Sequence, residues 1–318
     1  MEFVAGVMVF PGFPAAEVIY GDDGSVAGVI TQDMGIAADG SQKPDFQPGM
    51  EIHAKYTLFA EGARGSLTKQ LKAKFDLEKD CQPQTYGLGI KELWEIDPKK
   101  HVPGRVIHTQ GWPLDNDSWG GGFLYHIGDN QVALGFVTAL DYANPYLSPY
   151  HEFQRWKHHP DILDIIEGGK RVAYGARVIN EGGWQSVPQL AFPGGALIGC
   201  SAGFVNVPRI KGSHTAMKSG MLAAESVASA IAAGKEHTQL DDYEENLRES
   251  WIATELKKVK NAQPAIAKLG GDFGTVLAGI DMWMRTLKIG LPFTLKHTPD
   301  YTHTKRADLF DPIIYPKP

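Results

Sequence analysis

A buried strand that runs into a glycine-rich turn and then into a helix of small residues most limits how this chain can fold. The run Ala196–Cys200 is apolar without alternation, as in strands covered on both faces. It enters the turn Cys200–Gly203, and Gly212 stands where the next helix opens. That helix, predicted over Met217–Ala233, ends at Gly234. Strand, glycine turn and helix in this order predict an α/β layer.

Other segments carry strand signals of a different kind. Ala16–Tyr20 and Val26–Thr31 flank the turn sequence Gly21–Ser25, which predicts a hairpin. Between Pro83 and Asp141, strand-like runs are separated by turn residues, which favours an antiparallel sheet over repeated strand–helix–strand units. These runs are Tyr86–Ile96, Arg105–Gln110, Gly122–His126 and Gln131–Leu140, with Arg171–Ile179 as a further strand.

Three further segments are predicted as helices, and one apolar segment as a strand. The helices are Ser66–Phe75, Pro149–His159 and the charged run Asp242–Lys260. The apolar segment Met1–Phe13 has no basic leader and no clear cleavage site, so it is interpreted as a strand rather than a signal peptide.

Charge and cysteine content exclude several classes of protein. The net charge of −6 and the mixed distribution of signs argue against a nucleic-acid partner. The only cysteines, Cys81 and Cys200, lie far apart, so the sequence offers no cysteine-ligated metal site and no disulfide framework. No uncharged apolar run reaches the roughly 18 residues of a membrane-spanning helix.

Three long stretches of unusual composition carry a family resemblance. Together they resemble the electron transfer flavoprotein–ubiquinone oxidoreductases, and the similarity covers nearly the whole chain. The stretches are Gly111–Asp115 with Trp119–His126, Gln154–Pro160 with Glu167–Arg171 and Tyr174–Arg177, and Leu197–Ser201 with Asn206–Gly220.

The resemblance implies the fold class and the cofactors. We expect an α/β protein, α+β overall: part of an FAD domain of the glutathione-reductase type, with an inserted, mostly antiparallel quinone-binding domain. The family's N-terminal GxGxxG unit, which holds the FAD pyrophosphate, is absent from the sequence. The cysteines that ligate the family's 4Fe–4S cluster are absent as well. The implied domain ranges are 1–80 (FAD domain, second part), 81–187 (quinone-binding domain), 188–268 (FAD domain, return segment) and 269–318 (membrane plug and linker).

The resemblance places the quinone site at Gly120 and Gly121, with Trp119 as a wall. Glycines expose backbone N–H and C=O groups, so a flat ring can approach closely and accept hydrogen bonds at its carbonyl oxygens. A β-turn or bulge at a strand entrance is the structural alternative for the same residues.

The resemblance also implies the FAD contacts of this chain. They are Gly199, Ser201, Gly212 and Ser213, with Gly62 near the adenosine half. Backbone N–H groups at the helix start would face the flavin edge that becomes negative on reduction. A plain helix cap by Ser213 or Thr215 is the alternative. Cys200 is interpreted as a structural thiol, and no catalytic side chain is predicted because electrons would pass through cofactors.

The segment Phe273–Leu295 gives information on whether the protein associates with a membrane. As a helix over Thr275–Lys288 it gathers apolar residues on one face and charged residues on another. This pattern is typical of a helix lying in a membrane interface, and equally of one packed on a protein core. Trp283, Leu287 and Phe293 favour the membrane.

The sequence thus predicts the central part of an oxidoreductase that passes electrons from reduced electron transfer flavoprotein through FAD to ubiquinone. It would bind one membrane surface, in the bacterial cytoplasmic membrane or the mitochondrial inner membrane. Two alternatives remain: an FAD-dependent reductase of geranylgeranyl lipids, and an inactive truncated fragment.

Overall fold

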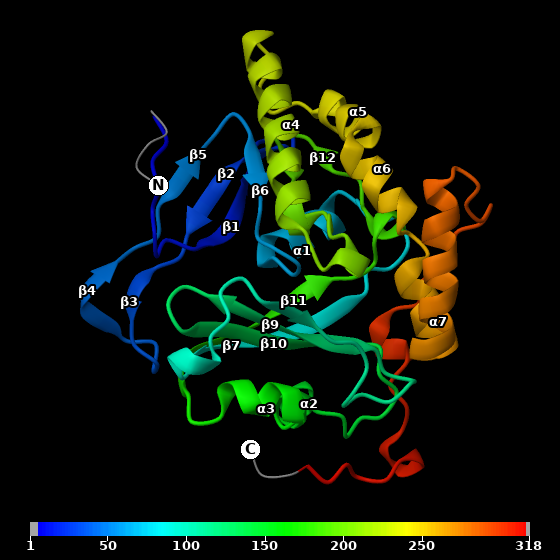
Figure 1. The fold of residues 1–318 in the computed structure, drawn as a ribbon. Helices are drawn as coiled ribbons and strands as arrows, with labels where there is room; N and C mark the ends of the chain where they lie inside the picture. The colour runs from blue at the N-terminus through cyan, green and yellow to red at the C-terminus, as the bar shows by residue number, and fades with distance from the viewer. Residues whose placement is uncertain (1–5, 316–318) are drawn as a thin grey trace.

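The computed structural model describes residues 6–315, and a five-stranded antiparallel sheet lies at its centre (Figure 1). The strand order is β11-β7-β10-β9-β8. Pairing of β10 with β7 runs without a break from Gln131 opposite Glu95 to Ala139 opposite Gly87. The prediction of an antiparallel sheet is therefore confirmed. The strands are β7 (Tyr86–Glu95), β8 (Val106–His108), β9 (Gly120–Ile127), β10 (Gln131–Ala139) and β11 (Lys170–Asn180).

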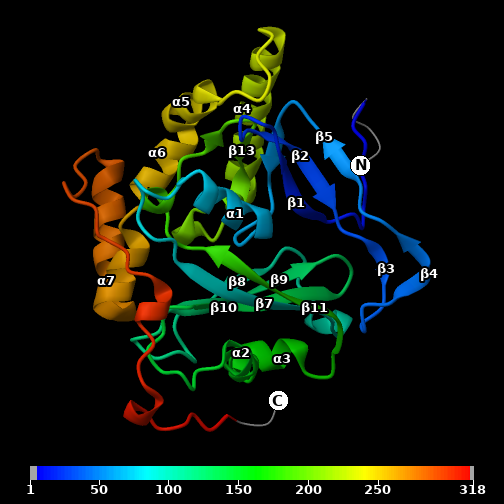
Figure 2. The ribbon, with the colours of Figure 1, turned by 180° about the vertical axis from the view of Figure 1, so that it is seen from behind.

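Two short helices cover one face of this sheet. They are α2 (Pro149–Lys157) and α3 (Pro160–Ile166). Each begins with a proline, whose missing N–H costs nothing in a first turn. Trp156 of α2 lies fully buried against the sheet, with its ring centroid 6.1 Å from that of Phe136. Figure 2 shows the same layers from behind, with the last residues running past both helices.

A second body lies over the other face of the sheet. Its strands β6 (Thr57–Phe59) and β13 (Gly195–Leu197) pair in parallel, although the whole five-stranded sheet separates them in sequence. The sheet is therefore an insertion, as the fold class predicted. The remaining elements of this body are β12 (Ala191–Phe192), α1 (Ser66–Lys74), α4 (Ser213–Ala232), α5 (Asp241–Glu249) and α6 (Trp251–Lys258).

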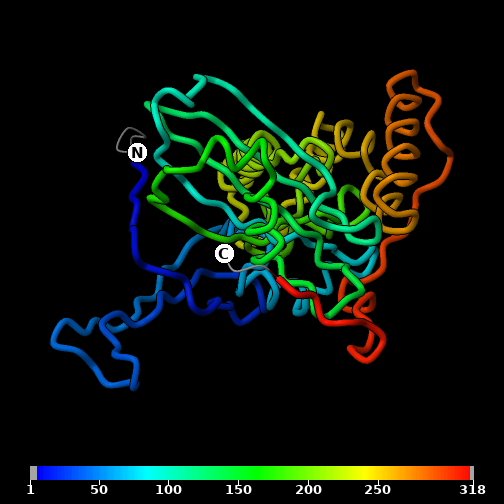
Figure 3. The backbone as a smooth tube through the Cα atoms, turned by 60° about the horizontal axis from the view of Figure 1, so that its bottom comes forward, coloured from blue at the N-terminus to red at the C-terminus, as the bar shows by residue number. Residues whose placement is uncertain are grey.

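The N-terminal part forms two small sheets. The predicted hairpin is present as β1 (Ala15–Tyr20) and β2 (Val26–Thr31), and β5 (Glu51–His53) pairs with β2. A second hairpin, β3 (Met34–Ile36) with β4 (Gln42–Gln47), projects from the molecule (Figure 3).

Three local predictions were wrong. The run Asp242–Lys260 is two helices rather than one, because Ser250 has extended backbone and its Oγ accepts a hydrogen bond from the Ile252 N–H at 3.2 Å, capping α6. Residues 6–13 form no strand, and residues 1–5 of that prediction lie outside the described part. Helix α4 begins directly after Gly212, where the glycine turn predicted a helix to open, so the predicted boundary at Met217 was four residues late.

Helix α7 (Ala262–Thr286) lies at one side of the molecule in all three views. It is longer than the predicted segment and kinks at Gly270, where φ is +77°. The kink is held by Asn116, whose carbonyl oxygen accepts from the Gly271 N–H and whose Oδ1 accepts from the Asp272 N–H, both at 2.9 Å.

Candidate functional site

The predicted glycine pair opens β9 and has a packing role. A β-carbon on Gly120 would lie 2.1 Å from the carbonyl oxygen of Val137, and one on Gly121 would lie 2.1 Å from that of Thr109. Both neighbours are backbone atoms of adjacent strands or their connection. The sheet itself therefore requires glycine at both positions, and the two residues pair with β10 in regular register rather than in the turn or bulge of the structural alternative.

The same glycines also line a cavity of about 550 Å³, referred to below as the ring cavity. Trp119 lines it beside them, so the three predicted quinone residues share one space. The 205–210 loop and the inner side of α7 complete its walls. The α7 residues are Ala262, Gln263, Ile266, Thr275, Ala278 and Met282. The walls are mostly apolar with a few polar groups, which is the usual character of a small-molecule site.

Four of the polar groups that line the ring cavity are buried and unpartnered. Trp119 Nε1, Asn180 Oδ1, Glu181 Oε2 and Gln263 Oε1 have no hydrogen-bond partner among residues 6–315. Since an unsatisfied buried polar atom costs roughly 1–3 kcal/mol, such a cluster favours a ligand with polar atoms of its own. Sequence analysis missed three of these four residues. Two of them, Asn180 and Glu181, could have been found from the sequence, because they are polar residues at the end of a predicted strand, directly before two glycines.

A carboxyl cluster lies beside the ring cavity at the start of β7. Glu181 follows the end of β11, and its backbone N–H donates to the Thr85 carbonyl at 2.7 Å. Asp300 Oδ2 accepts from the Tyr86 N–H at 2.9 Å. Burial, reinforced by Asp141 and Asp300, raises the pKa of Glu181 well above its usual value. Burial also raises the pKa of Asp300, to about 7.

The raised pKa of Asp300 predicts how stability depends on pH. A carboxyl group with a raised folded-state pKa binds its proton more tightly when folded, so its contribution is lost as pH rises from about 4 to about 7. Asp300→Asn keeps the acceptor for the Tyr86 N–H but cannot ionise. We expect Tm of the variant to fall less than wild-type Tm over this range in thermal scans; parallel curves would contradict the assignment.

The residues predicted to contact FAD lie at the carboxyl ends of two parallel strands. Gly62 follows β6 and Gly199 follows β13, and the strand ends are adjacent because Phe59 pairs with Leu197. Both glycines have positive φ, +86° and +58°. In open α/β sheets this edge is where ligands bind. Glu61 beside Gly62 is already used, since its carboxylate accepts hydrogen bonds from the N–H groups of α1.

The start of α4 provides free backbone donors. Its N-cap is Gly212, which has no side chain to cap the helix, and the first turn carries no acidic residue. Ser213 is exposed, and the Thr215 hydroxyl donates to the Phe204 carbonyl at 2.5 Å instead of accepting from the helix start. The alternative of a plain cap by either residue is therefore not what the structure shows. Ser201 Oγ is buried and unpartnered within the described residues. These groups fit the polar edge of a flavin.

The thiol of Cys200 lies near the same turn. It is half-buried, and burial raises its pKa, so it remains a neutral thiol rather than a reactive thiolate. This agrees with its interpretation as a structural residue.

Helix α7 holds an ion pair, Asp281 with Arg285, on its inner side and exposes several apolar residues on its outer side. Asp281 is only 1% exposed and accepts from Arg285 Nε at 2.8 Å. On the outer side Trp283 is 67% exposed, and Leu287 and Phe293 are about half exposed. The helix packs on the protein through small and apolar residues of its inner side, among them Ala278 and Met282, while a second group of apolar residues stays exposed. Further exposed apolar residues on the same segment are Phe273, Val276, Ile280 and Ile289.

Among the described residues, none of the helices combines the length and apolar character needed to cross a membrane. The exposed apolar residues of α7 belong to a helix that also carries buried polar contacts on its opposite side.

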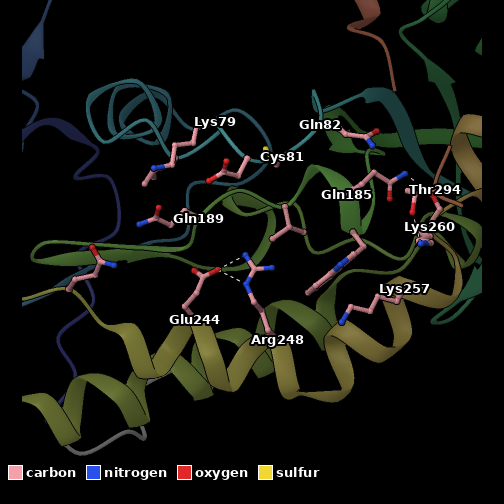
Figure 4. A pocket seen from close by; sticks show the side chains of 15 residues that line it. Lys79, Cys81, Gln82, Gln185, Gln189, Glu244, Arg248, Lys257, Lys260 and Thr294 are labelled. Atoms are coloured by element: carbon pink, nitrogen blue, oxygen red, sulfur yellow. Dashed lines mark hydrogen bonds and ion pairs between the residues drawn. The ribbon is translucent and has the colours of Figure 1, made fainter. Parts of the chain in front are cut away.

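A second pocket, of about 670 Å³, is polar and lies away from every predicted site residue (Figure 4). Two of its charged groups are paired, since Arg248 Nε donates to Glu244 at 2.7 Å. Arg248 and Lys257 also lie against the ring of Trp184. Nothing in this arrangement favours it over the ring cavity as the functional site.

Comparison with known proteins relates this geometry to a family. Residues 86–179, which are most of the five-stranded sheet, match the family model described as "ETF-QO, ubiquinone-binding". The chain is 54% identical over 98% of its length to the mitochondrial electron transfer flavoprotein-ubiquinone oxidoreductase of Homo sapiens and 53% identical to that of Arabidopsis thaliana. It covers 52% and 49% of those proteins. The chain thus spans about half the length of the curated relatives it matches.

Solved structures with much lower identity share the fold. A geranylgeranyl bacteriochlorophyll reductase-like protein from Thermoplasma acidophilum superposes with a TM-score of 0.62 at 17% identity, covering 84% of this chain and 61% of that one. A flavin-dependent brominase gives 0.52 at 16% identity, covering 87% and 64%. Both similarities concern the fold alone.

Proposed function

The chain is a homologue of the electron transfer flavoprotein–ubiquinone oxidoreductases over 98% of its length, and on that premise we propose that it forms the quinone-reducing part of such an enzyme. Electrons would arrive from reduced electron transfer flavoprotein and leave on ubiquinone. One observation carries the proposal. The sheet that matches the ubiquinone-binding family model contributes Gly120 and Gly121 to the ring cavity, which the inner side of α7 closes.

The ring cavity suits a quinone head group. Its apolar walls would bury the flat ring, while the unpartnered Trp119 Nε1 could donate a hydrogen bond to a carbonyl oxygen of the ring. The packing of the sheet requires glycine at positions 120 and 121. The absence of side chains at these two positions would also let a ligand approach the backbone closely.

FAD is the cofactor that we propose for the glycine turn and the start of α4. When bound, it would accept electrons from the donor protein and release them toward the quinone. Gly199 and Gly62 would lie against it at the strand ends, and Gly212 and Ser213 would present backbone N–H groups to its polar edge. The partial positive charge of a helix N-terminus favours the negative charge that reduction creates. Ser201 Oγ would gain a hydrogen-bond partner.

A 4Fe–4S cluster belongs to the expectation for an intact enzyme, and this chain does not fit one. The described residues contain no group of three or more candidate metal ligands, and the two cysteines of the sequence lie at positions 81 and 200. No step proposed for this chain passes through a cluster.

We also propose that α7 binds the surface of a membrane through its exposed apolar side. The names of the curated relatives place them in mitochondria, so the inner mitochondrial membrane, or the bacterial cytoplasmic membrane, is the proposed location. The domain ranges 1–80, 81–187, 188–268 and 269–318 remain our proposed division of the chain.

The direct test compares two acceptors. We expect the purified protein, supplied with FAD and reduced electron transfer flavoprotein, to reduce a short-tail ubiquinone and to leave a geranylgeranyl lipid unchanged. Reduction of the lipid without reduction of the quinone would overturn the proposal.

A charge placed at the start of α4 tests the FAD contact. Ser213→Asp puts a carboxylate in the first turn, where it stabilises the helix by roughly 0.3–1 kcal/mol. The same carboxylate would repel the flavin edge, so we expect retained flavin, measured by visible absorbance, to bind about tenfold more weakly while Tm does not fall. Ser229→Asp, at the far end of α4, is the matched control. Unchanged flavin affinity in Ser213→Asp would contradict the contact.

A further inference from the structure

We propose that Glu181 delivers protons to the quinone bound in the ring cavity and is itself reprotonated from solvent through Asp141 and Asp300. The inference rests on the proposed function, because it concerns the same cavity and the same acceptor. Reduction of a quinone to a hydroquinone consumes two protons, and a mostly apolar cavity needs a group that supplies them.

Glu181 has the position of such a group. It lines the ring cavity and is only 3% exposed, and its Oε2 has no hydrogen-bond partner in the described part of the chain. The carboxyl group fits because Gly87 leaves room for it: a β-carbon on Gly87 would lie 2.3 Å from Glu181 Oε1. The glycine in β7 therefore provides the space that the Glu181 side chain occupies.

The backbone of Tyr86 brings the other two carboxyl groups to Glu181. Its N–H donates to Asp300 Oδ2 at 2.9 Å, and its carbonyl accepts from the Leu140 N–H at 2.8 Å, which fixes the residue before Asp141. Asn180, the residue before Glu181, pairs with Tyr86 across the sheet. Three chain segments thus place one carboxyl group each around a single residue.

The cluster becomes more exposed away from the cavity. Glu181 is buried, whereas Asp141 and Asp300 are half-buried, and Asp300 Oδ1 is a further buried atom without a partner in residues 6–315. The other charged groups acting on the cluster are His303, which faces Asp141, and Arg64, which faces Asp300.

Electrostatics give the cluster a graded proton affinity. Burial and the two neighbouring aspartates raise the pKa of Glu181 well above its usual value, which favours the protonated carboxyl group. Burial raises the pKa of Asp300 to about 7, where it exchanges protons with solvent readily. Burial raises the pKa of Asp141 as well. A carboxyl group that holds its proton next to the acceptor is suited to general acid catalysis when a second carboxyl group, with a pKa near 7, can reprotonate it.

The step balances in atoms and electrons. The reduced flavoprotein donor supplies two electrons to the quinone. The O–H bond of the Glu181 carboxyl breaks as an O–H bond forms on a quinone carbonyl oxygen, leaving a Glu181 carboxylate. A proton from Asp141 or Asp300 then restores the carboxyl group, and solvent restores the aspartate. A second passage supplies the second proton of the hydroquinone.

Glu181→Gln tests the relay, because it keeps the size and polarity of the side chain and removes its proton. We expect reduction of short-tail ubiquinone to fall about a hundredfold relative to reduction of ferricenium, an acceptor that takes electrons without protons. Asp117→Asn, an exposed carboxylate outside the cluster, is the matched control and should leave this ratio unchanged. Equal quinone rates in Glu181→Gln and wild type, or equal losses with both acceptors, would overturn the relay.

An infrared readout tests the protonation state without turnover. The wild-type protein should show a protonated-carboxyl band at neutral pH that Glu181→Gln lacks, and short-tail ubiquinone should shift this band on binding. Absence of the band would overturn the relay alone. A wild-type protein that reduces ferricenium but never quinone would instead overturn the proposed function, and the relay with it.

Discussion

Met282→Trp is expected to lower ubiquinone reduction at least about tenfold while leaving reduction of an electron-only acceptor intact. Met282 lines the ring cavity from α7 and is half-buried, so a larger indole at this position would extend into the cavity. It would occupy the space of the quinone ring. A tenfold loss corresponds to about 1.4 kcal/mol of lost binding free energy, less than the cost of excluding most of a ring from its site. The measurement is the Michaelis constant for short-tail ubiquinone.

The matched control is Thr286→Trp. Thr286 lies one turn further along the same helix, and its hydroxyl donates to the Met282 carbonyl at 3.0 Å. It is exposed and does not line the ring cavity. We expect quinone kinetics of this variant to match wild type. Equal loss in both variants would show that the change acts through the helix rather than through the cavity.

The glycine pair is a poorer test of the same site. From the sequence, Gly121→Val promises a selective block of quinone reduction. In the structure, a β-carbon at Gly121 meets the Thr109 carbonyl oxygen at 2.1 Å, so the valine would disturb the pairing around β9. Loss of activity in that variant would report on folding and ligand binding together.

Trp283→Ser combined with Phe293→Ser is expected to reduce binding to lipid vesicles roughly a hundredfold. Trp283 is largely exposed on the outer side of α7, and Phe293, in the segment after the helix, is about half exposed. Moving one such side chain from water into an apolar phase is worth at least about 1.5 kcal/mol, and two are worth about 3 kcal/mol. Sedimentation with vesicles measures the change.

Two exposed tyrosines elsewhere provide the control. Tyr174 on β11 and Tyr301 near the carboxyl cluster are each about 80% exposed, yet neither lies on α7. Tyr174→Ser with Tyr301→Ser should leave vesicle binding unchanged. If the α7 double variant still sediments like wild type, the helix does not contact the membrane.

Much of the fold could be predicted from the sequence because local signals were strong. Turn residues separate the strands between Tyr86 and Ala139, and the resulting sheet has the expected antiparallel order. The single helix predicted over Asp242–Lys260 failed at Ser250, since a serine within a charged run can either remain in a helix or cap a new one, and only the packing of α6 decides.

The polar part of the candidate site was not predictable in the same way. Glu181, Asp141 and Asp300 are far apart in sequence and meet only because each contacts the segment around Tyr86. Periodicity likewise grouped the apolar residues of α7 on one face but could not say which way that face points. The buried contact of Asp281 with Arg285 settles it.

The position of α7 has a consequence for substrate choice. Ile266 and Met282 line the ring cavity, whereas Trp283 and Ile280 are exposed outside, so a single helix about 10 Å across separates the two environments. On the proposed function, a quinone whose head lies in the cavity would leave much of its isoprenoid chain beyond that helix. Discrimination among quinones would then rest on the ring substituents, and the number of isoprene units would be free to differ from one host membrane to another.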